Sequence, residues 1–170
     1  MVEKYEYFHK PVIITGKHSR FIDDMWKQNQ IQESYFKRLV DLYTIAPIIG
    51  LRMRRLAKED HLEDRKRTVQ VEQLMTKVED LKTIMQMVLL LDETSKLTME
   101  QKINRAFRGP NSEEEFQVNV ELFNAYVRGG IEILHEMLVQ RALGIEDEFS
   151  DVRIGNIVAL LNNPLVPDIE

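Results

Sequence analysis

The chain has 170 residues, a net charge of -5, 44% hydrophobic and 30% charged residues, which is an ordinary composition for one globular domain. It contains no cysteine, and this excludes disulfide frameworks, thiolate nucleophiles and cysteine-ligated zinc. The acidic balance argues against a protein that binds polyanions over its whole surface. Because Met1–Lys10 is charged and aromatic and no apolar run reaches about 18 residues, we expect a soluble cytoplasmic protein that does not contact membranes.

The start of the chain is predicted to contain one strand and one helix. Residues 1–19 are expected to form an N-terminal arm, in which Val12, Ile13 and Ile14 make a brief strand because they are consecutive and β-branched. A helix is expected over Phe21–Lys27.

A helical period follows from Ser34 to Leu56. Pro47 lies inside this stretch, where it removes a backbone donor and clashes with the preceding turn, so a kink or a break is expected there. The next segment, Lys58–Arg67, is charged apart from Leu62 and His61. We interpret it as a loop or as frayed helix ends.

The clearest helical signal runs from Val71 to Leu91. Apolar residues alternate spacings of three and four, which places them on one stripe of a single helix. These residues are Val71, Leu74, Val78, Leu81, Met85 and Val88.

Two further helices are predicted from their capping motifs. Thr98–Gln101 and Ser112–Glu115 both have the spacing in which a hydroxyl side chain caps the first turn and an acid or amide reaches back. The first motif predicts a short helix that ends at Phe107, and Arg108–Asn111 then forms a turn. Three acidic residues after Ser112 stabilise the start of the second helix, because the N-terminal end of a helix carries partial positive charge.

The C-terminal part is predicted to be helical as well. The helix that begins at Ser112 is expected to reach Leu143 and to end at Gly144. A last helix is expected over Ser150–Leu161, and residues 163–170 are expected to be a mobile tail. The whole chain, residues 1–170, is therefore predicted to be an all-α single-domain bundle of six or seven helices, in which the helices Val71–Leu91 and Ser112–Leu143 form the long central pair.

No catalytic, cofactor or metal site is predicted, and we expect the protein not to be an enzyme. Gly16 and Lys17 lack the other residues of a phosphate-binding loop, since Pro11 and His18 stand where a glycine and a hydroxyl are needed. The pair Glu132 and His135 has the spacing of a di-metal bundle site, which also needs a second such pair and two more glutamates. The only other pair with this spacing, Glu6 and His9, lies in a segment that is not expected to be helical. The acids Glu113–Glu115 are better explained by the helix start than by magnesium binding.

Basic residues form the strongest candidate for a binding site. The segment Arg52–Arg67 is rich in basic residues, but four acids lie between them: Glu59, Asp60, Glu63 and Asp64. This mixture favours solvated, self-paired charge, although arginine-rich segments also suit phosphate or carboxylate partners. The candidates for nucleic-acid or acidic-partner contacts are Arg52, Arg54, Arg55, Arg65, Lys66 and Arg67, with Lys102 and Arg105 beside them.

Gly129 and Gly130 are the second candidate site. Each glycine in a helix costs about 1 kcal/mol relative to alanine, so a compensating contact is expected. Close approach of another helix is the simpler explanation, and a kink or contact with a partner chain is the alternative.

Two stretches, Phe36–Gly50 (FKRLVDLYTIAPIIG) and Phe123–Leu134 (FNAYVRGGIEIL), resemble small helical accessory proteins encoded with bacterial DNA-restriction and phage-defence systems. The resemblance implies a subunit that acts beside an ATPase or nuclease. This resemblance, together with the lack of a recognisable catalytic motif in the sequence, leads us to expect a non-catalytic adaptor or scaffold in a larger assembly. The alternative is a nucleic-acid-binding subunit that uses the segment Arg52–Arg67.

Overall fold

The computed structural model describes residues 5–140, 152–162 and 165. In this part of the chain there are seven α-helices and one two-stranded sheet, which confirms a mainly all-α domain of six or seven helices. A short 3-10 turn, Ile31–Glu33, separates the first two helices. The elements are β1 (Val12–Thr15), α1 (Gly16–Met25), α2 (Leu39–Arg52), β2 (Lys66–Val69), α3 (Val71–Met75), α4 (Val78–Leu91), α5 (Met99–Phe107), α6 (Glu113–Leu138) and α7 (Val152–Asn162).

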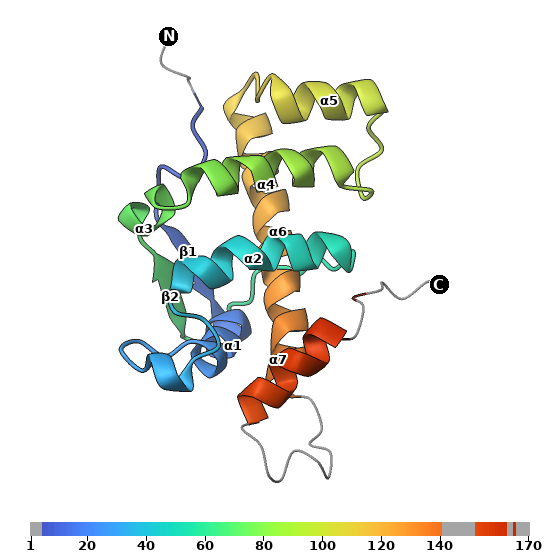
Figure 1. The fold of residues 1–170 in the computed structure, drawn as a ribbon. Coiled ribbons are helices and arrows are strands. Elements are labelled where there is room, and N and C mark those ends of the chain that lie inside the picture. The colour runs from blue at the N-terminus through green and yellow to red at the C-terminus, as the bar shows by residue number, and fades with distance from the viewer. Residues whose placement is uncertain (1–4, 141–151, 163–164, 166–170) are drawn as a thin grey trace.

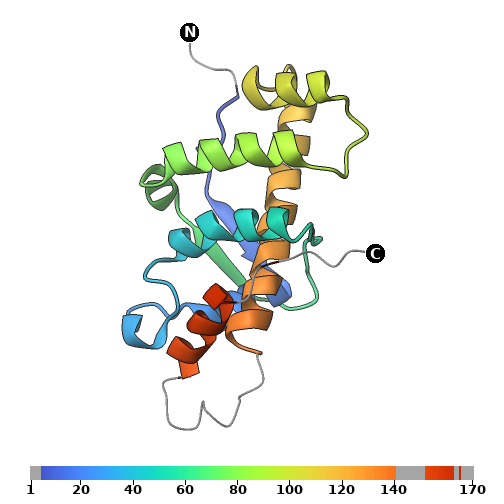
Figure 2. The same cartoon turned by 45° about the vertical axis from the view of Figure 1, so that its right-hand side comes forward.

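Helix α6, with 26 residues, is the axis of the molecule. Helices α5, α4 and α2 cross it at successive levels, α7 lies at its C-terminal end, and the small sheet lies to one side (Figures 1 and 2). The core lies where these helices meet, and it includes the buried side chains of Ile22, Tyr43, Leu81 and Phe123.

The central helix pair is α2 with α6, and the predicted pairing of Val71–Leu91 with Ser112–Leu143 is wrong. A methyl group added to Gly130 would lie 1.8 Å from the carbonyl oxygen of Ala46, and one added to Gly50 would lie 2.2 Å from that of Tyr126. Only glycine allows two helix backbones to approach this closely. Helix α4 packs mainly against α5 and α2 instead.

The predicted helix Val71–Leu91 is also divided. Helix α3 ends at Met75, and α4 begins at Val78. Between them the hydroxyl of Thr76 donates a hydrogen bond to the carbonyl oxygen of Gln73 at 2.7 Å, and such side-chain bonds compete with helix continuation. The apolar spacing survives this break, because Leu74 and Leu81 are both buried in the core.

Pro47 causes no break, in contrast to one of the two predicted outcomes. Helix α2 runs through Pro47 and ends at Arg52, before Leu56. Ala46 and Pro47 are both buried, and the packing of α2 against α6 outweighs the loss of one backbone donor.

The sheet corrects two further predictions. Strand β1 pairs antiparallel with β2, with Val12 opposite Val69 and Thr15 opposite Lys66. The end of the predicted loop Lys58–Arg67 is therefore part of a strand. The predicted arm 1–19 is not an arm from residue 12 onward, because β1 leads directly into α1, which begins at Gly16 rather than near Phe21.

The predicted caps of α5 and α6 are confirmed. The Thr98 hydroxyl accepts from the Gln101 amide at 3.2 Å, and the Gln101 side chain accepts from the Thr98 amide at 2.9 Å. The Ser112 hydroxyl accepts from the Glu115 amide at 3.1 Å. Helix α6 ends at Leu138 rather than at Leu143. The predicted helix end at Gly144 and the predicted tail 163–170, apart from residue 165, lie outside the described residues.

Candidate interaction surface

The outer face of α7 carries an apolar stripe. Ile154, Ile157, Val158 and Leu161 have the helical spacing i, i+3, i+4, i+7, and they are 61%, 38%, 48% and 78% exposed. The opposite face holds α7 to α6 through the buried Asn156, whose amide donates to the carbonyl oxygen of Leu138 at 2.7 Å. An apolar helix stripe normally faces the core. In α7 it faces outward, which is typical of a surface that a partner covers.

A second apolar stripe lies on α5. Met99, Ile103 and Phe107 are spaced four residues apart on one side of this short helix, and all three are exposed. Helices α5 and α7 lie at opposite ends of α6 (Figures 1 and 2). The molecule thus presents two separate apolar surfaces, one at each end of its longest helix.

The predicted basic residues at the end of α2 are already paired. Arg52, Arg54 and Arg55 extend from the last turn of this helix and the residues after it. Their partners are, in the same order, the carbonyl oxygen of Leu165 at 3.0 Å, Glu93 at 3.3 Å and Glu136 at 2.6 Å.

The predicted basic residues at β2 form a second group. Arg65 and Arg67 both pair with Asp23 of α1, at 3.7 and 2.7 Å. Lys66 between them is exposed and makes no ion pair with a described residue. This group lies on the other side of α6 from the end of α2 (Figures 1 and 2), so the two halves of the predicted basic segment do not merge into one patch.

Lys102 and Arg105 form a third location on α5. The Lys102 amine donates to the carbonyl oxygen of Asp92 at 2.5 Å, and Arg105 donates through Nε to the side-chain oxygen of Asn119 at 2.6 Å. The eight predicted basic contacts are therefore spread over three places. Four of the eight form ion pairs with acids of the chain itself, and the separation of the three places disfavours a continuous phosphate-binding surface.

Gly129 and Gly130 are buried against the chain's own backbone. A methyl group on Gly129 would lie 1.9 Å from the carbonyl oxygen of Arg55, while Gly130 faces Ala46. Close packing within the chain accounts for both glycines, and neither is accessible to a partner.

Helices α1 and α6 enclose a buried histidine. The Nε2 atom of His18 lies 3.0 Å from Glu132 Oε1, and the amine of Lys17 lies 2.9 Å from the same oxygen. Burial lowers the pKa of His18, and the hydrogen bond with Glu132 only partly offsets this. The ring is therefore neutral near pH 7 and donates from Nε2 to Glu132, whose charge Lys17 balances.

His135 makes a separate pair. Its Nε2 atom lies 2.8 Å from Asp24 Oδ2, and its ring stacks on Phe21 with 4.0 Å between ring centres. Glu132 and His135 thus contact different residues of α1 and do not share a ligand. In the described part of the chain, no group of three or more histidine, aspartate or glutamate side chains is arranged to hold a metal ion. Sequence reasoning missed both pairs, because only the packing of α1 on α6 creates them.

Comparison of the chain with protein-family profiles, curated proteins and solved structures found no match. Among the helices that the structure describes, none has the length and apolar character to cross a membrane. The stretches Phe36–Gly50 and Phe123–Leu134 lie in and next to α2 and within α6. They meet at the glycine contact of the central helix pair.

Proposed function

We propose that this chain is a non-catalytic interaction subunit, an adaptor or scaffold in a larger intracellular assembly, and that the α7 stripe is its main partner-binding surface. The observation that carries the proposal is the outward direction of Ile154, Ile157, Val158 and Leu161 on a helix that is fixed to the domain through Asn156. An amphipathic helix with i, i+3, i+4 and i+7 anchors is a common way to occupy an apolar groove of another protein.

The energetics favour a partner over solvent. Full burial of an exposed leucine or isoleucine side chain contributes about 1.5–3 kcal/mol. The four side chains of the stripe can therefore supply much of the interaction free energy of a moderate complex, after association costs are subtracted.

The α5 stripe supports the scaffold form of the proposal. Met99, Ile103 and Phe107 are too far from α7, across the length of α6, to belong to the same contact. The resemblance to accessory proteins of restriction and phage-defence systems makes an ATPase or nuclease the first partner to test.

The test is affinity purification of the full chain from its native host, in wild-type form and with Leu161→Asp. Leu161 is exposed, so the substitution leaves the fold intact but places a charge in the contact. Loss of one leucine contact should weaken partner binding by at least about tenfold. Leu62→Asp is the matched control, because Leu62 is 95% exposed in a loop outside both stripes.

The outcomes separate the alternatives. A partner that is lost with L161D and kept with L62D supports the proposal, and a second copy of the chain in that role identifies a homodimer. A wild-type chain that is monomeric and alone at native concentration contradicts it, as does equal recovery of the partner with both variants.

A nucleic-acid-binding subunit is the second candidate. The observation in its favour is local: Arg65, Lys66 and Arg67 are consecutive and exposed, and Asp23 is the carboxylate with which both arginines pair. Phosphate contacts would make DNA or RNA affinity fall steeply with salt, by a log–log slope of about 0.7–0.9 per contact. R65E/R67E should abolish such binding and R54E/R55E should retain it, whereas equal loss, or no binding at low salt, rejects this use of the segment.

A further inference from the structure

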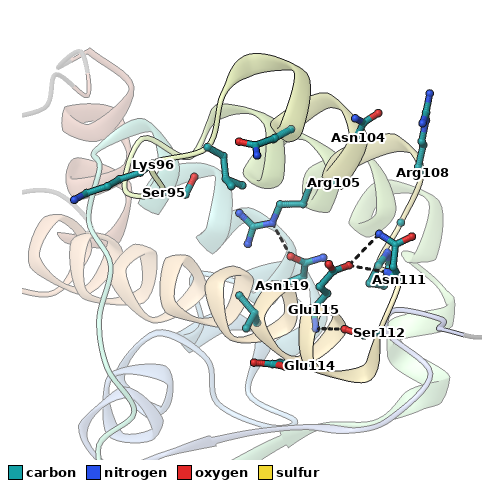
Figure 3. Close-up of a pocket in the computed structure, with 15 residues that line it drawn as sticks. Ser95, Lys96, Asn104, Arg105, Arg108, Asn111, Ser112, Glu114, Glu115 and Asn119 are labelled. Carbon is teal, nitrogen blue, oxygen red and sulfur yellow. Dashed lines mark hydrogen bonds between the residues drawn. The ribbon is translucent and has the colours of Figure 1, made fainter.

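A cavity of about 900 Å³ opens between α5, the loop before it and the first turns of α6 (Figure 3). Binding sites for small molecules commonly have volumes of about 300–1,000 Å³. Its walls combine polar side chains, among them Gln101, Asn104 and Asn111, with the apolar Leu97 and Val118. Neither the α7 stripe nor the internal ion pairs described above account for it.

Arg105 reaches from α5 into this cavity (Figure 3) and is held in place. Its Nε atom donates to Asn119 at 2.6 Å, and the amide of Asn119 donates in turn to the hydroxyl of Tyr7 at 2.8 Å. Asn119 is only 2% exposed, so this chain of hydrogen bonds fixes the guanidinium from behind. The two terminal nitrogens of Arg105 make no hydrogen bond with any described residue.

Arg105 forms no ion pair with a residue that the structure describes. Among the described residues no carboxylate is within ion-pair distance of it, although Asp92 and Glu115 are near enough to act through space. Both acids are engaged elsewhere. Glu115 accepts from the amide of Asn111 at 2.7 Å, and Asp92 accepts from Thr94, Ser95 and Tyr126.

Partial burial makes this arrangement unusual. Burial lowers the pKa of Arg105, and the nearby acids only partly offset that effect. Buried charges in proteins are normally paired, because taking an ion out of water costs free energy. A fixed arginine whose free nitrogens face a cavity is therefore suited to an anion from outside the chain.

We infer that the cavity binds a small organic anion whose carboxylate or phosphate group forms a bidentate pair with Arg105. Lys96 and Arg108 point away from the centre of the cavity in Figure 3, so one anionic group, and not several, meets a cation inside it. The amides of Gln101, Asn104 and Asn111 bind the uncharged polar part of the ligand. The site is distinct from the α7 stripe, so this inference does not depend on the proposed function.

The test is calorimetric titration of the full chain with inorganic phosphate, acetate, glutamate and citrate. Ionic strength is held constant with sodium chloride, so that general salt effects cancel. At least one of these probes should bind saturably with one site per chain. Arg105→Gln should weaken that binding by at least about tenfold, because a charge-assisted bidentate contact is lost. Arg38→Gln is the matched control, since Arg38 is exposed and pairs with Asp41 on α2.

A second measurement does not rely on a variant that folds. In two-dimensional NMR of the wild-type chain, the bound probe should shift the amide signals of Leu97, Asn111 and Val118 and leave those of α1 unchanged. The inference is overturned if none of the four probes binds, if R105Q and R38Q bind equally well, or if the shifted signals lie outside the cavity. An effect that follows ionic strength and not the identity of the anion overturns it as well.

Discussion

The glycine contact between α2 and α6 can be tested by Gly130→Ala. The added methyl carbon would lie 1.8 Å from the carbonyl oxygen of Ala46, which is about 1.6 Å short of the 3.4 Å at which ordinary contact begins. The methyl carbon is bonded directly to Cα and the oxygen is part of the α2 backbone, so no side-chain rotation relieves the overlap, and the two helices must separate.

Two opposing effects set the magnitude. Alanine is favoured over glycine in a helix by about 1 kcal/mol. Overpacking a core commonly costs about 1–3 kcal/mol, and overlap with backbone lies at or above the upper end of that range. We therefore expect a net loss of about 2 kcal/mol or more in the free energy of unfolding, measured by urea denaturation.

Gly109→Ala is the control. A methyl group there would meet no atom within 4 Å, but φ is +77°, so only conformational strain of about 1 kcal/mol is expected. A G130A protein as stable as the wild type would refute the close approach of α2 and α6. A G109A protein that loses more stability than G130A would show that strain, and not steric overlap, dominates at glycines in this chain.

Two further predictions concern buried titratable groups. Burial lowers the pKa of His18, so the folded state favours the neutral ring. The contribution of this ring to the free energy of unfolding is complete above the pKa of histidine in the unfolded chain, about 6.5, and is lost as the pH falls below that value. Urea denaturation between pH 5 and 8 should show this decline in wild-type protein and in the control H61Q, which changes an exposed histidine, and a flat profile would contradict it. Asp92→Ala should lower the free energy of unfolding by about 3 kcal/mol, because Tyr126, Thr94 and Ser95 lose a buried acceptor. Asp92→Asn keeps an acceptor oxygen and should cost less in the same assay; an equal effect of both variants would mean that this network contributes little.

Local signals in the sequence predicted the local structure. The starts of α5 and α6 were predicted correctly, because Thr98 and Ser112 cap them through bonds that span three residues. Strand β2 was missed for two reasons. Only Val69 among its four residues is buried, and its partner strand β1 is more than fifty residues earlier in the sequence. A period in sequence shows which face of a helix is apolar, but it does not show which helix covers that face.

The same limit applied to the sites. A helix was predicted over Ser150–Leu161, but the outward direction of the apolar stripe of α7 depends on how Asn156 attaches this helix to α6. The cavity around Arg105 could not be predicted, because it requires α5 and α6 to meet at a turn and Tyr7 to come back from the start of the chain. Gly129 and Gly130 were a usable signal: two glycines in one helix pointed to close approach, although not to α2 as the neighbour.

The length of α6 gives the two apolar surfaces a fixed spacing. At about 1.5 Å per residue, a helix of 26 residues spans about 39 Å, and α5 and α7 are attached near its two ends. Two proteins bound to these surfaces would be held at that separation and at a fixed angle around the axis of α6. Insertion of a single residue into α6 would turn one surface by about 100° relative to the other. The length of this helix therefore sets both the distance between the two surfaces and their relative orientation.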